Sequence, residues 1–239
     1  MGVASVQFHS AGLGKSVEYH VILPERGDGP FPVLLQLHGL SDDASAWLQR
    51  ANLVRHVAHY PLLVVLPDGG TSGYLNWRAP ERLGQQNYED LLMRDIPAHL
   101  ARHFNVRPGS WAIGGLSMGG YGAMRLGLKY PDRFASIWAH SSAFHIGQMA
   151  TGDWFADPAD ADISTHARAL ANAATRPVIS FDCGLDDELL QYNRGFHREL
   201  DELGIAHHYA EHPGGHTWEY WDAHVQVALA QHARVLGIA

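Results

Sequence analysis

The stretch WAIGGLSMGG, residues 111–120, places Ser117 between two glycines where an apolar segment ends and a helical pattern, residues 121–129, begins. A strand, a sharp turn that carries a serine, and a helix form the context of a nucleophile elbow, which predicts a serine hydrolase. Gly115 and Gly119 would supply room for the strained backbone of such a turn. Because the chain has 25 glycines, the bare pattern is also compatible with a tight structural turn.

Outward from this stretch, buried apolar strands alternate with segments of helical period along the chain. The expected strands lie at residues 3–8, 16–23, 31–37, 62–66, 111–115, 134–140, 177–182 and 207–211. The expected helices lie at residues 41–60, 87–104, 121–129, 188–203 and 218–236. This alternation predicts an α/β fold, with a mostly parallel central sheet, helices on both faces and an antiparallel pair at one edge. We expect one domain over residues 1–239, with residues 144–176, which have no strong period, as an inserted loop or cap.

Composition narrows the classes of function. At 239 residues, 46% hydrophobic and 18% charged, the chain is typical of a globular protein. A formal charge of −8 without a lysine and arginine cluster argues against nucleic acid or an anionic membrane as partner, and no stretch has the apolar length of a membrane span. The single cysteine, Cys183, excludes an intrachain disulfide. Residues 1–10 have no signal-peptide pattern, so we expect a cytoplasmic location. Whether the chain forms a homo-oligomer stays open.

A serine hydroxyl needs a base beside it, and the base needs an orienting group. In an α/β-hydrolase the three residues follow the order serine, acid, histidine, each after the carboxyl end of a strand. The loop after the strand at 177–182 contains Asp186 and Asp187, and a Gly-rich loop after the next strand presents His216. The order and spacing favour Ser117, Asp187 and His216 as a catalytic triad, with Asp186 as the alternative acid and helix capping as the other role of these aspartates.

The oxyanion hole of such an enzyme takes two backbone N–H groups, one from the residue after the nucleophile and one from the loop after an early strand. Met118 follows the serine, and its N–H is the first candidate. Leu40 follows the strand at 31–37 and is the second, with Gly39 as its alternative. A simple strand-terminating turn at His38 and Gly39 is the competing interpretation.

With these motifs assembled, the chain resembles the esterase family that includes esterase D, S-formylglutathione hydrolases, tributyrin esterases, feruloyl esterases and mycolyltransferases. The motifs that carry the resemblance are LHG at 37–39 followed by Trp47, GLSMGG at 115–120, CGLDD at 183–187 and PGGHTWEYW at 213–221. They cover nearly the whole chain. The resemblance implies the α/β-hydrolase fold and hydrolysis of acyl esters, and the Gly-x-x-Asp pattern of the family implies Asp187 as the acid.

The sequence therefore predicts a serine carboxylesterase that hydrolyses short-chain acyl esters through an acyl-enzyme and needs no metal or organic cofactor. Its expected partner is a small-molecule ester. Trp218, two residues after the predicted catalytic histidine, and Trp154 in the expected cap are candidate substrate-binding residues.

Three alternatives remain beside this prediction. The same triad would serve an acyltransferase or a thioesterase similar to S-formylglutathione hydrolase. A non-catalytic binding module on the same fold is a second. A metal-binding protein that uses His207, His208, His212 and His216 is a third, although these histidines lack a regular ligand spacing.

Overall fold

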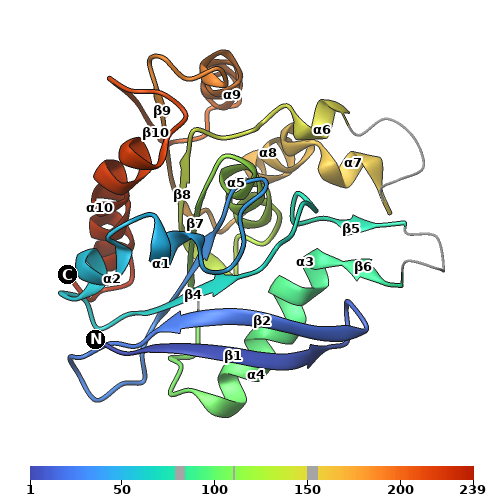
Figure 1. Cartoon of the computed structure of the whole chain (residues 1–239). Helices are drawn as coiled ribbons and strands as arrows, with labels where there is room; N and C mark the ends of the chain where they lie inside the picture. Colours follow the sequence, from blue (N-terminus) through green and yellow to red (C-terminus); the bar gives the residue numbers. More distant parts are fainter. Residues whose placement is uncertain (79–83, 110, 150–155) are drawn as a thin grey trace.

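The computed structural model describes residues 1–78, 84–109, 111–149 and 156–239, and its centre is one large twisted sheet (Figure 1). In spatial order the eight strands are β1 (Val3–Ser10), β2 (Lys15–Ile22), β4 (Leu63–Pro67), β3 (Val33–Leu37), β7 (Trp111–Leu116), β8 (Phe134–His140), β9 (Val178–Gly184) and β10 (His208–His212). From β4 to β10 neighbouring strands run parallel, whereas β1 and β2 pair antiparallel at one edge and β2 is antiparallel to β4. The predicted α/β fold with a mostly parallel sheet is confirmed.

Helices cover both faces of this sheet, which makes three layers. On one face lie α1 (Ala46–Gln49), α2 (Leu53–Val57) and α10 (Trp218–Val235). On the other lie α3 (Tyr88–Asp90), α4 (Ile96–His103), α5 (Met118–Lys129), α8 (Ile163–Ala171) and α9 (Leu190–Glu202). Two short helices, α6 (Ile146–Met149) and α7 (Pro158–Ala161), precede α8.

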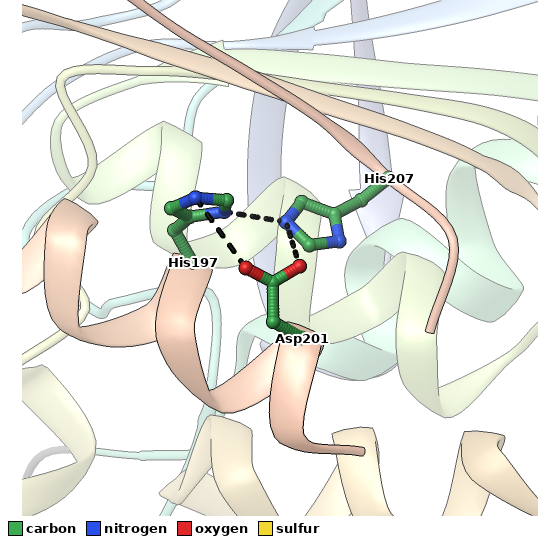
Figure 2. A group of neighbouring side chains, drawn as sticks. All are labelled: His197, Asp201 and His207. Carbon is green, nitrogen blue, oxygen red and sulfur yellow. Dashed lines mark hydrogen bonds and ion pairs between the residues drawn. The ribbon is translucent and has the colours of Figure 1, made fainter. Parts of the chain in front are cut away.

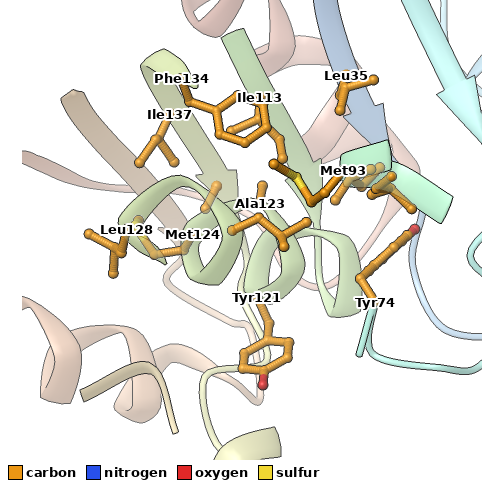
Figure 3. Packing of buried hydrophobic residues seen from close by; sticks show 14 of the residues in the cluster. Leu35, Tyr74, Met93, Ile113, Tyr121, Ala123, Met124, Leu128, Phe134 and Ile137 are labelled. Atoms are coloured by element: carbon orange, nitrogen blue, oxygen red, sulfur yellow. The ribbon is translucent and has the colours of Figure 1, made fainter. Parts of the chain in front are cut away.

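The period-two alternation of the strands divides their side chains between two cores. Leu35 and Ile113 point to the face covered by α5, whereas Leu34 and Ala112 point to the face covered by α10. Figure 3 shows the first core, in which Met124 of α5 and its neighbours pack onto the sheet. Because both faces are buried, the central strands read as continuous apolar runs in the sequence.

Two predicted helices differ from the structure. Residues 41–60 form only α1 and α2: Ser41, with a φ of 70°, lies outside any helix, and turns or bends precede α1, separate it from α2 and follow α2. Residues 87–104 are helical as predicted, but a π turn, η2 (Leu91–Asp95), separates α3 from α4. A small hairpin of β5 (Asn76–Trp77) and β6 (Gln86–Asn87) was not predicted.

The expected cap at residues 144–176 is wrong for its second half. Helix α8 buries Ile163, Ala167 and Leu170 against the core beside α5, so this part covers the sheet. Those apolar residues do recur at helical spacing, but the alanine-rich composition weakens the signal. No helix in the described part of the chain is long and apolar enough to cross a membrane.

Candidate active site

Ser117 occupies the sharp turn between β7 and α5. Its φ of 54° and ψ of −117° are unfavourable for a residue with a Cβ. The turn is held by its neighbours, since Ser117 N–H donates to the His140 carbonyl at 2.9 Å and its carbonyl accepts from Ala143 N–H at 3.1 Å. A Cβ at Gly115 would lie 2.4 Å from the Gly119 carbonyl oxygen, and one at Gly119 would lie 2.5 Å from the His38 carbonyl oxygen. The two glycines therefore allow the close approach that the sequence predicted.

His216 connects Ser117 to Asp187. Its Nε2 lies 3.0 Å from Ser117 Oγ, and its Nδ1 lies 2.9 Å from Asp187 Oδ2. A carboxylate only accepts hydrogen bonds, so Nδ1 carries the proton and Nε2 presents its lone pair to the serine hydroxyl. The structure brings together three residues from three separate loops, in the arrangement that lets a histidine remove a serine proton.

The Asp187 carboxyl is fully buried beneath the histidine. Burial raises its pKa, but hydrogen bonds from His216 and from Leu189 N–H outweigh burial and hold the pKa below its ordinary value. The acid is therefore ionised at neutral pH and fixes the His216 tautomer. Asp186, the alternative acid of the sequence analysis, has an exposed side chain.

A buried histidine supports the loop that carries Leu40. His38 Nε2 accepts from Gly69 N–H at 2.8 Å, so its Nδ1–H donates to the Gly39 carbonyl, also at 2.8 Å. Tyr74 donates its hydroxyl to the His38 carbonyl at 2.9 Å. Hydrogen bonds therefore hold the backbone just before Leu40 in place.

The N–H of Met118 lies at the start of α5, where the helix dipole is positive. No described residue accepts a hydrogen bond from the backbone N–H of Met118 or of Leu40. Both donors are therefore free to serve an incoming oxyanion.

A cavity of about 900 Å³ opens over Ser117 and His216. Segments after the carboxyl ends of six strands contribute to its lining, through Leu40, Ser72, Ser117, His145, Leu189 and His216. This is where parallel α/β sheets place their ligands. A second cavity of about 890 Å³ lies between β9, β10 and α10, and none of the three residues of the hydrogen-bonded chain lines it.

The substrate-binding predictions need correction. Trp218 is not among the residues that line the cavity; its ring is partly buried and packs edge-on against Trp47 and Trp221, beside the core under α10. Trp154 lies outside the described residues. The aromatic side chains that do line the cavity are Trp77 and Tyr192, to which the sequence analysis gave no role. Trp77 lies in the short strand β5, in the segment that follows the carboxyl end of β4, which is a usable signal, whereas nothing local marks Tyr192 on its helix.

Another serine and histidine are also in contact. Ser136 Oγ lies 2.8 Å from His232 Nδ1, but both residues have no exposed surface and neither lines the cavity over Ser117. A substrate in that cavity therefore meets Ser117 and not Ser136.

The four histidines of the alternative metal site do not cluster. His216 bonds Ser117 and Asp187, and His212 stacks on His224 with ring centroids 4.2 Å apart. Within the described ranges, the one group of three side chains close enough to share an ion contains only His207 of that set.

The chain is similar to several known proteins. The model of the family described as "Putative esterase" matches residues 10–232. The acetyl esterase of Caldicellulosiruptor saccharolyticus is 31% identical, over 98% of this chain and 99% of that protein. Fluorophosphonate-binding serine hydrolase F of Staphylococcus aureus is 25% identical with a TM-score of 0.84, covering 97% of this chain and 98% of that one.

A third protein, an S-formylglutathione hydrolase from Agrobacterium tumefaciens, has a TM-score of 0.88 at 22% identity, over 98% of this chain and 95% of that one. At that identity the likeness establishes the fold alone. The family match spans nearly the whole chain, and the relative of 31% identity covers it fully. The chain therefore belongs to this esterase family and is a carboxylic ester hydrolase with the α/β-hydrolase fold.

Proposed function

We propose that Ser117 is the nucleophile, His216 the general base and Asp187 the orienting acid of a short-chain carboxylesterase. The observation that carries this proposal is the hydrogen-bonded chain Asp187–His216–Ser117 at the cavity. Ser117 Oγ attacks the acyl carbon while His216 Nε2 takes its proton, and His216 then returns the proton to the leaving alcohol. Water attacks the acyl-enzyme in the second half, with His216 again as base.

The negative oxygen of each tetrahedral intermediate would lie between the N–H groups of Leu40 and Met118. Loss of one such donor typically costs about 3–4 kcal/mol of transition-state stabilisation. Both N–H groups come from well-held segments, one following the loop braced by His38 and the other at the first turn of α5. Donors that are already oriented stabilise the developing charge without reorganising during the reaction.

The lining of the cavity favours neutral esters. Its apolar members include Leu40, Trp77 and Ile146, and its described residues include Glu188 but no lysine or arginine. Because the described lining has a carboxylate and no cation, it disfavours a substrate with a negatively charged leaving group, such as a glutathione thioester. The acetyl esterase relative agrees with a short acyl group.

The first experiment measures hydrolysis of p-nitrophenyl esters from acetate to decanoate by the wild type, Ser117→Ala and Ser136→Ala. Ser136 is the matched control, because it also contacts a histidine but lies buried away from the cavity. We expect turnover to be highest with the shortest esters. Ser117→Ala should lose at least about a thousandfold in kcat/KM, whereas Ser136→Ala should retain activity.

Two results would contradict the proposal. If Ser117→Ala is as active as the wild type, another group attacks the ester. If the wild type neither hydrolyses any of the esters nor reacts with a fluorophosphonate probe, a non-catalytic binding module is favoured. Adding alcohol acceptors to the same assay separates hydrolysis from acyl transfer, since a transferase would form the new ester in place of the free acid.

A further inference from the structure

Three side chains away from Ser117 converge on one point of the surface (Figure 2). His197 and Asp201 lie one turn apart on α9, and His207 lies just before β10. His197 Nδ1 lies 2.8 Å from His207 Nε2. Asp201 Oδ1 lies 3.9 Å from His207 Nε2, and Asp201 Oδ2 lies 3.5 Å from His197 Nε2. One nitrogen or oxygen atom of each residue lies within 4.8 Å of the others.

The backbone fixes which nitrogen of His207 is free. Its Nδ1 lies 2.7 Å from the carbonyl oxygen of Ile205, which only accepts, so Nδ1 carries the proton. Nε2 therefore presents a lone pair to His197 and Asp201. A second nitrogen bonded to a backbone carbonyl is the usual support of a metal-binding histidine, because it sets both tautomer and ring orientation.

The rings are held where they are. His207 is nearly buried, with 3% of its side chain exposed, and it stacks on Phe181 at a ring-centroid distance of 5.8 Å. His197 packs against Tyr209 at 4.9 Å. His197 and Asp201 remain open to solvent, with 37% and 62% of their side chains exposed. An ion could therefore enter from solvent and meet an oriented ligand.

The three side chains present more lone pairs to one another than N–H groups. The His207 Nε2 lone pair and the Asp201 carboxylate both face His197, and a neutral His197 has only one N–H to donate. A divalent ion satisfies all three ligands while each histidine stays neutral.

We propose that His197, Asp201 and His207 form a binding site for zinc or a similar divalent transition-metal ion. Two imidazoles and a carboxylate are ligands of this class of ion, whereas magnesium and calcium take oxygen ligands. Tetrahedral bonds of about 2.0–2.1 Å place two nitrogen ligands about 3.3 Å apart, so the two nitrogens, now 2.8 Å apart, would have to separate by about 0.5 Å and turn toward the ion. Water would take the fourth position.

The site would be structural and not part of ester hydrolysis. At a rise of about 1.5 Å per residue, Asp201 lies roughly 14 Å along α9 from Tyr192, which lines the cavity. The ion would tie the second half of α9 to the start of β10. Those two elements follow Asp187 and precede His216, respectively, so the ion would stabilise the part of the fold that holds both. This inference does not depend on the proposed function.

The test is zinc binding by the full chain after removal of metal with a chelator, at pH 7.5, in competition with a chromophoric zinc chelator. The chain has 17 histidines in all. The competitor excludes weak zinc binding to those outside the proposed site. The variants are His197→Ala, at a half-buried position, and Asp201→Asn, which alters only an exposed side chain and should leave folding unaffected. His224→Ala is the matched control, because His224 stacks on His212 in another close histidine pair.

We expect the wild type and His224→Ala to bind one zinc ion per chain. Each of the two site variants should bind at least about a hundredfold more weakly, since loss of even an outer-shell partner costs 10–100-fold. Zinc at about a hundredfold excess over the wild-type Kd should raise the Tm of the wild type by about 5–10 °C and that of the site variants by no more than about 1–2 °C. If the wild type binds no ion under competition, or if the site variants bind as it does, the proposal is wrong.

Discussion

Ser117 has a backbone conformation that is costly for any residue but glycine, and it is one of four such residues among those described. The others are Ser41, Tyr74 and Ser141, each in a loop after the carboxyl end of a strand. Residues in unfavourable backbone conformations persist only where their surroundings hold them, and they gather at functional sites. Here the surroundings are the tight contacts of β7, β3 and β8 around the elbow.

Exchange of either neighbouring aspartate for asparagine tests the orienting acid. Asp187→Asn removes the charge that holds Nδ1–H of His216, so kcat for p-nitrophenyl acetate should fall by about 10³–10⁴. Asp186→Asn alters an exposed side chain one residue away and should retain nearly full activity. Equal losses in both variants would mean that Asp187 has no special part in orienting His216.

At the scale of elements, a buried ion-pair cluster joins three helices of one face. Arg125 of α5, whose side chain is fully buried, donates to Glu89 of α3 and to Asp160 of α7. Lys129 contacts the same two carboxylates at 2.7 and 2.6 Å. Burial raises the pKa of the Glu89 carboxyl, but the charge of Arg125 and the hydrogen bonds outweigh burial and lower it. The short helices of this face are therefore tied to α5 by charge.

Removal of one carboxylate tests that connection. Glu89→Ala leaves a buried guanidinium with fewer partners and should lower the free energy of unfolding by about 3 kcal/mol. Arg94→Ala removes the exposed partner of Asp90 one turn along the same helix and should change it by no more than about 0.5 kcal/mol. Urea unfolding of both variants measures the difference. A loss below about 1 kcal/mol for Glu89→Ala would show that the cluster contributes no more than a surface pair.

Across the whole molecule, polar side chains cross the layer between the sheet and α10. Asp182 of β9 has no exposed surface and accepts hydrogen bonds from Trp138, His140 and Tyr220 at 2.6 to 2.8 Å. His232 of α10 is buried in the same layer, and desolvation lowers its pKa to about 3. This layer makes the stability of the fold sensitive to acid.

The free energy of unfolding should fall as the pH falls, because the unfolded chain binds a proton at His232 that the folded chain does not. His232 is neutral in the folded chain down to about pH 3, whereas in the unfolded chain a histidine takes a proton near pH 6.5. Below pH 6.5 the unfolded state therefore gains stability, and the free energy of unfolding falls by up to about 1.4 kcal/mol per pH unit. From pH 7.5 to pH 5.0 the wild type should lose roughly 2 kcal/mol more than His232→Gln.

Urea unfolding at the two pH values measures this difference. His59→Gln is the control, because His59 is exposed. Between the two pH values, this variant should lose as much free energy of unfolding as the wild type. If His232→Gln also loses as much free energy of unfolding as the wild type, the buried histidine is not the source of the acid sensitivity.

Local sequence patterns were enough to predict the fold and the order in which the candidate site residues occur along the chain. Strand and helix periods, the Gly-flanked Ser117 and the two later loops follow from rules that act within one element or at one sheet edge. Asp187 was favoured over Asp186 by spacing and family pattern, but the contact with His216 depends on how two loops meet.

The remaining features depend on packing between segments that are far apart in sequence. Trp218 is a predicted substrate contact, yet its ring packs against the tryptophans beside α10, and Tyr192 from α9 lines the cavity instead. The convergence of His207 with His197 and the burial of Arg125 have no local signal either. Strand order and helix docking decide such contacts. They bring together side chains that are far apart in the sequence and are not linked by any repeating pattern.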